Sequence, residues 1–199
     1  MWTMPPEWQL HTATWMGFPT GAYDTAGVSD DEVFDAWAQV ANTISEHEPV
    51  HMLCHPGQLT IAQRKLASAV TLHAFEIDDA WIRDSGPTFV TGEHGLGGVD
   101  WVFNGWGDHT AFDWSQDAKV ASHIIELTGA KRLGSDLVNE GGGIHVNGEG
   151  DVLLTRTVQL DPGRNPTATE DTVEAEVHQK LGTERAIWFD RGLWRDYRD

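Results

Sequence analysis

Short apolar segments alternate along this chain with longer segments of helical spacing, and that alternation most constrains the fold. A helix is predicted to begin after Ser29, because Ser29 and Glu32 have the spacing of a capping box. The apolar run Val50–Leu53 follows Pro49 and predicts a short buried strand. The apolar face of the first helix is expected at helical intervals, on Val33, Trp37, Val40 and Ile44.

The same two patterns recur through the rest of the chain. Glycine turn residues within Glu93-His94-Gly95 predict a hairpin between Thr88–Thr91 and Gly97–Phe103. The other predicted strands are Leu72–Ile77, Ile144–Val146, Val152–Thr155 and Arg185–Phe189. The other predicted helices cover Leu59–Ala69, a segment capped by Ser115 and closed by Gly129, and residues 168–181, capped by Thr167 with Glu170 and closed by Gly182. No linker divides these elements, so we expect one α/β domain over residues 1–199.

Composition excludes several classes of protein. The formal net charge of −18 repels nucleic acid and anionic lipid, and it favours cationic ligands. A single cysteine excludes an internal disulfide framework and is typical of a reducing compartment. No apolar run approaches the ~20 residues of a membrane-spanning helix. The expected protein is therefore soluble and cytoplasmic, and it binds neither nucleic acid nor membrane.

The charged segment Asp78–Pro87 is the strongest functional candidate. It lies between two apolar segments, so a strand end is expected to bring three acids, one arginine and Trp81 to a single place. Carboxylates beside an aromatic face suit a flat organic cation, because the acids accept its N–H groups and the ring covers its face. Asp84 precedes Gly86-Pro87, whose turn fixes its direction. A solvated turn with an ion pair is the alternative interpretation.

A second candidate carboxylate is Glu140, which precedes three glycines. Glycines permit backbone paths that are closed to other residues, and they leave space around a neighbouring carboxylate. A glutamate before a glycine run is also common in surface turns. Two such carboxylates, each at the mouth of a strand pair, favour a site more than either does alone.

Histidines and the cysteine invite a metal interpretation, which the pattern does not favour. His51, Cys54 and His55 could supply three zinc ligands. On a strand, however, His51 and Cys54 point to opposite faces, so core packing of Cys54 is the better interpretation. His145 could be a ligand, a base or a structural histidine. We predict no metal and no cofactor, since the chain also lacks a nucleotide-binding glycine motif.

At these residues the sequence resembles the agmatine deiminase family, a branch of the guanidino-group-modifying enzymes that includes bacterial peptidylarginine deiminases. The matching blocks follow one another in the family's order and cover nearly the whole chain. They are Met4–Trp8, His11–Trp15 with Pro19, Asp78–Pro87, Phe103–Gly107, Glu140–His145, Gly148–Gly150 and Arg164–Pro166. The family is longer, and the match covers only its N-terminal half or slightly more.

The resemblance implies an α/β fold, a partial pentein-type propeller of ββαβ modules with two to three of five modules present. It implies hydrolysis of a guanidinium to a urea with release of ammonia, as in conversion of agmatine to N-carbamoylputrescine. By resemblance, Asp84 grips the guanidinium, Trp81 lines the pocket, and Glu140 faces the substrate and assists catalysis. His145 matches the family but receives no catalytic role.

One departure from the family concerns the reaction itself. The family's catalytic histidine, its second guanidinium-binding aspartate and its cysteine lie in motifs that these 199 residues lack, and Cys54 does not match the nucleophile. We therefore expect the N-terminal part of a longer deiminase, without turnover on its own. A second copy or a complementary C-terminal half is expected to cover exposed module edges. A non-catalytic acidic module that binds cations, one half of a split enzyme, and a histidine-based metal hydrolase are the alternatives.

Overall fold

A computed structural model of the chain describes residues 1–21, 27–108 and 113–193. Contacts between residues divide it into two compact units, and each is described by itself. The first unit comprises Met1–Gln9, Arg83–Asp113 and Ala118–Asp199, and the second comprises Leu10–Ile82 and Trp114–Asp117. The single domain expected over residues 1–199 stays a prediction.

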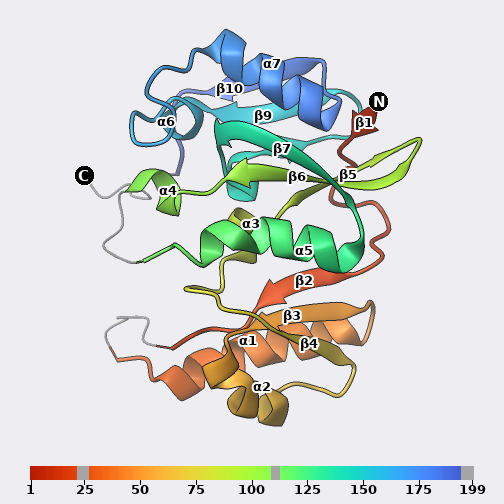
Figure 1. Cartoon of the computed structure of the whole chain (residues 1–199), viewed down its shortest axis with the longest axis vertical. Helices are drawn as coiled ribbons and strands as arrows, with labels where there is room; N and C mark the ends of the chain where they lie inside the picture. The colour runs from red at the N-terminus through yellow and green to blue at the C-terminus, as the bar shows by residue number, and fades with distance from the viewer. Residues whose placement is uncertain (22–26, 109–112, 194–199) are drawn as a thin grey trace. The chain divides into compact units, whose positions relative to one another are not determined.

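The second unit is a small parallel sheet packed against two helices (Figure 1). Its strands are β2 (Thr14–Gly17), β3 (Val50–Cys54) and β4 (Val70–Ala74), in that spatial order. Its helices are α1 (Asp30–Ser45) and α2 (Leu59–Lys65), the latter preceded by the 3-10 turn η1 (Pro56–Gln58). Apolar side chains of one sheet face and both helices form its core, including Phe18, Phe34, Ala41, Met52 and Ala62.

Helix α1 confirms the predicted start but only part of the predicted face, from which Ile44 packs partly buried against the core. The Ser29 side chain accepts from the Glu32 amide while the Glu32 carboxylate accepts from the Ser29 amide, which completes the capping box. Phe34, Ala38 and Ala41 are the buried residues, whereas Val40 is 51% exposed. The hydrophobic pattern has two overlapping stripes, and the stripe with the small alanines allows the closer approach to the sheet.

The first unit contains two sheets. One has the spatial order β1 (Trp2–Thr3), β5 (Thr88–Gly92), β6 (Gly95–Val102), β7 (Lys131–Val138). The other has the order β10 (Arg185–Phe189), β9 (Asp151–Thr155), β8 (His145–Val146). Helix α7 (Glu170–Leu181) shares one core with both sheets through Val90, Val99, Val152, Leu154, Val173 and Val177 (Figure 1). Helix α5 (Val120–Thr128) packs on β6, where Ile125 lies against Gly98.

Several predicted elements of the first unit agree with the structure. The hairpin β5–β6 pairs Gly92 with Gly95 across the predicted turn. Strands β8 and β9 fall on the predicted strands Ile144–Val146 and Val152–Thr155, and they pair antiparallel. Strand β10 has the predicted bounds. Helices α5 and α7 end at Gly129 and Gly182, both with left-handed backbone.

Other boundaries were wrong or missed. Strand β7 was not predicted, because its charged start and Gly134 give no continuous apolar run. Helix α7 is capped by Thr169 with Thr172 in place of Thr167 with Glu170. Helix α5 begins after the 3-10 turn η2 (Asp117–Lys119), not at Ser115. Among the described residues, no helix is long and apolar enough to span a membrane.

The two helix-ending glycines allow a matched test of backbone strain against steric contact. Their φ angles are nearly equal, 67° for Gly129 and 68° for Gly182. A Cβ at Gly129 would meet no atom within 4 Å, whereas one at Gly182 would lie 2.2 Å from the Trp2 carbonyl oxygen. We expect Gly129→Ala to cost roughly 1 kcal/mol through left-handed strain alone. Gly182→Ala should cost about 2 kcal/mol more, because β1 must move. Urea unfolding of the two variants checks this, and equal losses would contradict it.

Candidate active site

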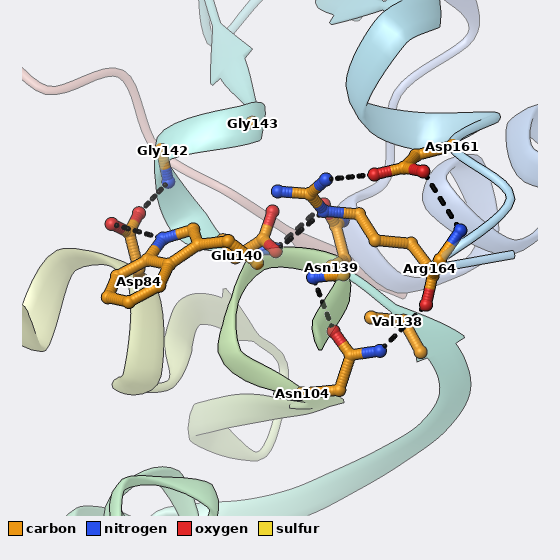
Figure 2. A network of polar contacts seen from close by, with 12 residues as sticks. Asp84, Asn104, Val138, Asn139, Glu140, Gly142, Gly143, Asp161 and Arg164 are labelled. Carbon is orange, nitrogen blue, oxygen red and sulfur yellow. Dashed lines mark hydrogen bonds and ion pairs between the residues drawn. The ribbon is translucent and has the colours of Figure 1, made fainter. Parts of the chain in front are cut away.

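Asp84 is held in a fixed orientation by two donors from distant parts of the first unit. It lies in α3 (Ile82–Ser85), directly before the predicted Gly86-Pro87 turn. Its Oδ1 accepts from the Gly142 amide at 3.0 Å, and its Oδ2 accepts from the Trp106 indole Nε1 at 3.2 Å (Figure 2). Burial raises the pKa of Asp84, and these two hydrogen bonds and the charges of Arg83 and Arg164 oppose that rise.

Glu140 is more deeply buried and is held by an arginine. It follows β7, precedes the 3-10 turn η3 (Gly141–Gly143), and is only 2% exposed. Its Oε1 accepts from Arg164 Nε at 2.8 Å (Figure 2). Burial raises the pKa of Glu140, the Arg164 guanidinium opposes this, and the charge of Asp84 raises it further. The charge of Asp84 thus acts on Glu140, and the charge of Arg164 acts on both predicted carboxylates.

The glycine run after Glu140 is what brings the two segments together. A Cβ at Gly141 would lie 2.2 Å from the Arg83 carbonyl oxygen, and one at Gly142 would lie 2.4 Å from Asp84 Oδ1. No side chain fits at either distance. The glycines were predicted to leave space around Glu140, but the carboxylate that Gly142 approaches is that of Asp84.

A methyl group at Gly142 should disturb the site, while one at Gly134 should not. Gly142→Ala must displace the Asp84 carboxylate, so we expect it to weaken binding of a guanidinium ligand about 10-fold or more. Gly134 is the matched control, because a Cβ there would meet nothing within 4 Å. Calorimetric titration of both variants with agmatine checks the difference. Equal affinities for the two alanine variants would show that the close approach does not matter.

Trp106 is a site residue that sequence reasoning did not single out. It is the one non-glycine with positive φ among the described residues, with φ 60° and ψ 43°, inside the short helix α4 (Gly105–Asp108). Its ring stands edge-on to Phe103, and Asn104 fixes the turn by accepting from the Gly107 amide at 2.8 Å. Left-handed backbone at a bulky residue is costly and gathers at functional sites. The glycines around Trp106 signalled an unusual turn, but not the indole's contact with Asp84.

Arg164 is the second residue that was missed. It is 8% exposed and contacts two acids, donating from Nε to Glu140 and from Nη1 to Asp161 Oδ2 at 2.6 Å. The block Arg164–Pro166 was noted only as a family likeness. Arginine is mostly exposed in proteins, so its burial here was not predictable from local sequence.

The segment Asp78–Pro87 does not bring all its charged residues to one set of partners. Asp78 accepts from the Gln116 and Asp117 amides, and Asp117 accepts in return from the Asp78 and Asp79 amides. Trp81 belongs to the second unit, where it is 44% exposed and edge-on to Trp37. The expected meeting of three acids at one place was therefore wrong for Asp78 and Asp79. The substrate-binding role of Trp81 stays a prediction.

The residues of the rejected zinc interpretation have other partners. His51 Nδ1 lies 2.9 Å from His73 Nε2, with Trp15 stacked on both rings. His55 Nε2 lies 2.8 Å from Glu76. Cys54 is fully buried, and burial raises the pKa of its thiol to about 11. Within the described part of the chain, no three metal-ligating side chains cluster. His145 is exposed on β8.

The fold and site define a mixed α/β protein whose first unit carries a buried carboxylate, Glu140, and a half-buried one, Asp84, beside an indole and a guanidinium. Residues 3–199 match the family described as Porphyromonas-type peptidyl-arginine deiminase. The chain belongs to that family, as the sequence resemblance indicated, and the expected α/β class is confirmed.

The relatives and solved structures that match this chain are longer than it is. A Streptomyces coelicolor protein named "Putative agmatine deiminase" is 52% identical, over 98% of this chain and 58% of its own length. A protein of the same name from Streptomyces avermitilis is 50% identical, over 98% of this chain and 57% of its own. The solved agmatine deiminase of Enterococcus faecalis is 34% identical with a TM-score of 0.88, covering 94% of this chain and 52% of that one. The chain thus spans little more than half the length of the relatives that it matches.

Proposed function

We propose that this chain is the guanidinium-binding part of a guanidino-group hydrolase that converts agmatine to N-carbamoylputrescine and ammonia. The family membership and the names of its relatives support the reaction class. The observation that carries the proposal is the proximity of half-buried Asp84 and buried Glu140: the charge of Asp84 acts on Glu140, and burial raises the pKa of both. Arg164 holds one oxygen of Glu140, and a cationic substrate would add positive charge between the two carboxylates.

The two carboxylates suit a guanidinium for a chemical reason. A guanidinium is planar and delocalised, and its N–H groups match carboxylate oxygens. Asp84 would grip it from an orientation already set by Gly142 and Trp106. Glu140 would hold a second edge and accept a proton during the reaction, because burial has raised its pKa. Trp81 remains a proposed contact of the bound substrate.

The nucleophile of the reaction would come from outside these 199 residues. In the proposed reaction a cysteine thiolate attacks the central guanidinium carbon and ammonia leaves with a proton from a histidine. Water then cleaves the thiouronium adduct, giving the urea and restoring the thiolate. Cys54 is the chain's single cysteine, and at a pKa of about 11 its buried thiol is almost wholly protonated at neutral pH. The remaining propeller modules, from a longer chain or a complementary half, would add the thiol and the histidine.

A non-catalytic module that binds guanidinium compounds is the second candidate. The same state of Cys54 favours it, since no other thiol is available in the sequence. The hydrolase and the binding module would share the same cation site, and only the hydrolase would convert the bound guanidinium to product. A cytoplasmic location fits both and is supported by the free cysteine.

The proposal is tested by calorimetric titration of the 199-residue chain with three related ligands. Agmatine should bind, while putrescine, which lacks the guanidinium, and N-carbamoylputrescine, which has a neutral urea, should bind far more weakly. Glu140→Gln should weaken agmatine binding. Asp100→Asn is the control, because Asp100 is also buried beside an arginine, Arg132, but elsewhere in the first unit. If agmatine and putrescine bind with equal affinity, the site does not recognise a guanidinium and the proposal fails. If the 199-residue chain forms N-carbamoylputrescine by itself, the claim that the nucleophile comes from outside it fails.

A further inference from the structure

Arg164 forms the centre of a buried charge cluster that the proposed chemistry does not itself require. Glu140, Asp161 and Arg164 are 2%, 7% and 8% exposed. Nε donates to Glu140 Oε1 at 2.8 Å, and Nη1 donates to Asp161 Oδ2 at 2.6 Å. The guanidinium therefore spans two acids with separate nitrogens, in place of forking onto one of them (Figure 2). A lysine has no fixed pair of donors with this separation.

Asp161 holds the arginine in place through a tight turn. Its carbonyl oxygen accepts from the amides of Arg164 and Asn165, at 3.0 and 2.7 Å, and its Oδ1 accepts from the Gly163 amide at 2.9 Å. The Asn165 side chain then ties this turn to the end of β7, accepting from the Val138 amide and donating to the Val138 carbonyl. Glu140 lies two residues beyond that tie. Turn and carboxylate are thus fixed to the same strand end.

The contacts of Glu140 are one-sided. Its Oε1 accepts from Arg164, while Oε2 accepts no hydrogen bond from the residues that the structure describes. The backbone amide of Glu140 donates to Asn139 Oδ1, and Gln159 Nε2 donates to that same oxygen at 2.8 Å. One carboxylate oxygen is therefore anchored by Arg164, while the other has no hydrogen bond from the described residues. The charged groups that act on Glu140 are Arg164, Asp84 and Asp161.

We infer that Arg164 is a positioning residue, which anchors one oxygen of Glu140 so that the other faces a bound guanidinium. The charge of Arg164 also lowers the pKa of Glu140, against the effect of burial. This inference rests on the proposed function, because it assigns the anchored carboxylate to that substrate. It also gives a reason for the position of the Arg164 guanidinium, which lies beside a site proposed to bind the guanidinium of a substrate. Arg164 also donates to Asp161, and it contacts only one oxygen of Glu140.

The first test follows Glu140 directly, with no substrate present. Carboxyl ¹³C NMR titration of glutamate-labelled chain is compared for wild type, Arg164→Gln and Arg156→Gln. Arg156 is a matched control, since it also donates to two acids, Glu170 and Asp190, but outside the site. The Glu140 signal, assigned by its loss in Glu140→Gln, should titrate at higher pH in Arg164→Gln and at the wild-type pH in Arg156→Gln. If Arg164 had only a structural role, its substitution would not shift the titration midpoint of Glu140. An Arg164→Gln variant with the wild-type Glu140 midpoint would therefore overturn the inference.

The second test measures agmatine affinity against pH. Arg164→Gln should bind about 10- to 100-fold more weakly at pH 7. The loss should shrink as pH rises, because Glu140 then becomes ionised without the arginine. Arg164→Lys keeps the charge but loses one of the two contacts, so its affinity should fall without the pH dependence. If wild type binds no agmatine, the proposed function fails. If wild type binds and Arg164→Gln matches its affinity at every pH, only the role of Arg164 fails.

A third variant covers the case in which Arg164→Gln does not fold. Asp161→Asn leaves Arg164 and Glu140 in place but loosens the anchor of the guanidinium. We expect a smaller loss of agmatine affinity than in Arg164→Gln. The affinity is the readout for this variant, because the charge of Asp161 itself raises the pKa of Glu140 and its removal shifts the midpoint the other way. Wild-type agmatine affinity in Asp161→Asn would overturn the inference.

Discussion

Asp84→Asn should reduce the affinity for agmatine by on the order of 100-fold and leave the chain folded. The carboxylate supplies the negative charge and both acceptors that a guanidinium edge needs, and an amide presents N–H groups to that same edge. Stability should change little, because two effects oppose each other. The variant removes a buried charge, but one of the donors from Gly142 and Trp106 then faces an amide nitrogen.

Two measurements check the Asp84 prediction together. Calorimetry with agmatine gives the affinity, and urea unfolding gives the stability of the same preparation. Asp100→Asn, which alters a buried acid paired with Arg132 elsewhere in the unit, should retain wild-type affinity. An Asp84→Asn protein that is folded and binds agmatine as tightly as wild type would contradict the assigned role of Asp84.

The chain should become more stable as pH falls from 7.5 to 5, in contrast to most proteins. Burial raises the pKa of Asp84 and of Glu140, and it raises the pKa of Asp117 to about 6. A carboxyl with a higher pKa in the folded state binds its proton more tightly there, so protonation favours folding. Asp117 alone should add on the order of 1 kcal/mol by pH 5.

The carboxyls with lowered pKa act in the opposite direction, but at lower pH. Hydrogen bonds from Ser29, Thr14 and Arg185 lower the pKa of Glu32, Glu48 and Asp151, respectively. Their stabilisation is present above their unfolded-state values and is lost only as pH falls further, so a stability maximum near pH 5 is expected. Unfolding by urea at a series of pH values checks this. Asp117→Asn should flatten the rise, and a wild-type stability that falls steadily from pH 7.5 to 5 would contradict it.

Local signals in the sequence predicted local features well. The Ser29–Glu32 capping box, the glycine ends of α5 and α7 and the hairpin β5–β6 each depend on residues close together in the chain. Strand β7 escaped prediction, because its burial pattern comes from pairing with β6 and contact with α7, not from an apolar run.

The candidate site could be predicted only in part. Asp84 and Glu140 were found because glycine and proline turns mark carboxylates that need a defined direction. Arg164 and Trp106 were not, since their roles depend on partners 24 and 22 residues away in the chain. Asp78 and Asp79 were grouped with Asp84 by sequence proximity, whereas their bonding partners lie around Asp117. Non-local pairing therefore determined which charges share the site.

A crystal structure of the chain with agmatine bound tests the central claim most directly. The account predicts one guanidinium with N–H groups donating to both Asp84 and Glu140 Oε2 at about 2.9 Å, while Arg164 keeps its contact with Oε1. A guanidinium that touches neither carboxylate, or that binds only at exposed acids, would contradict it.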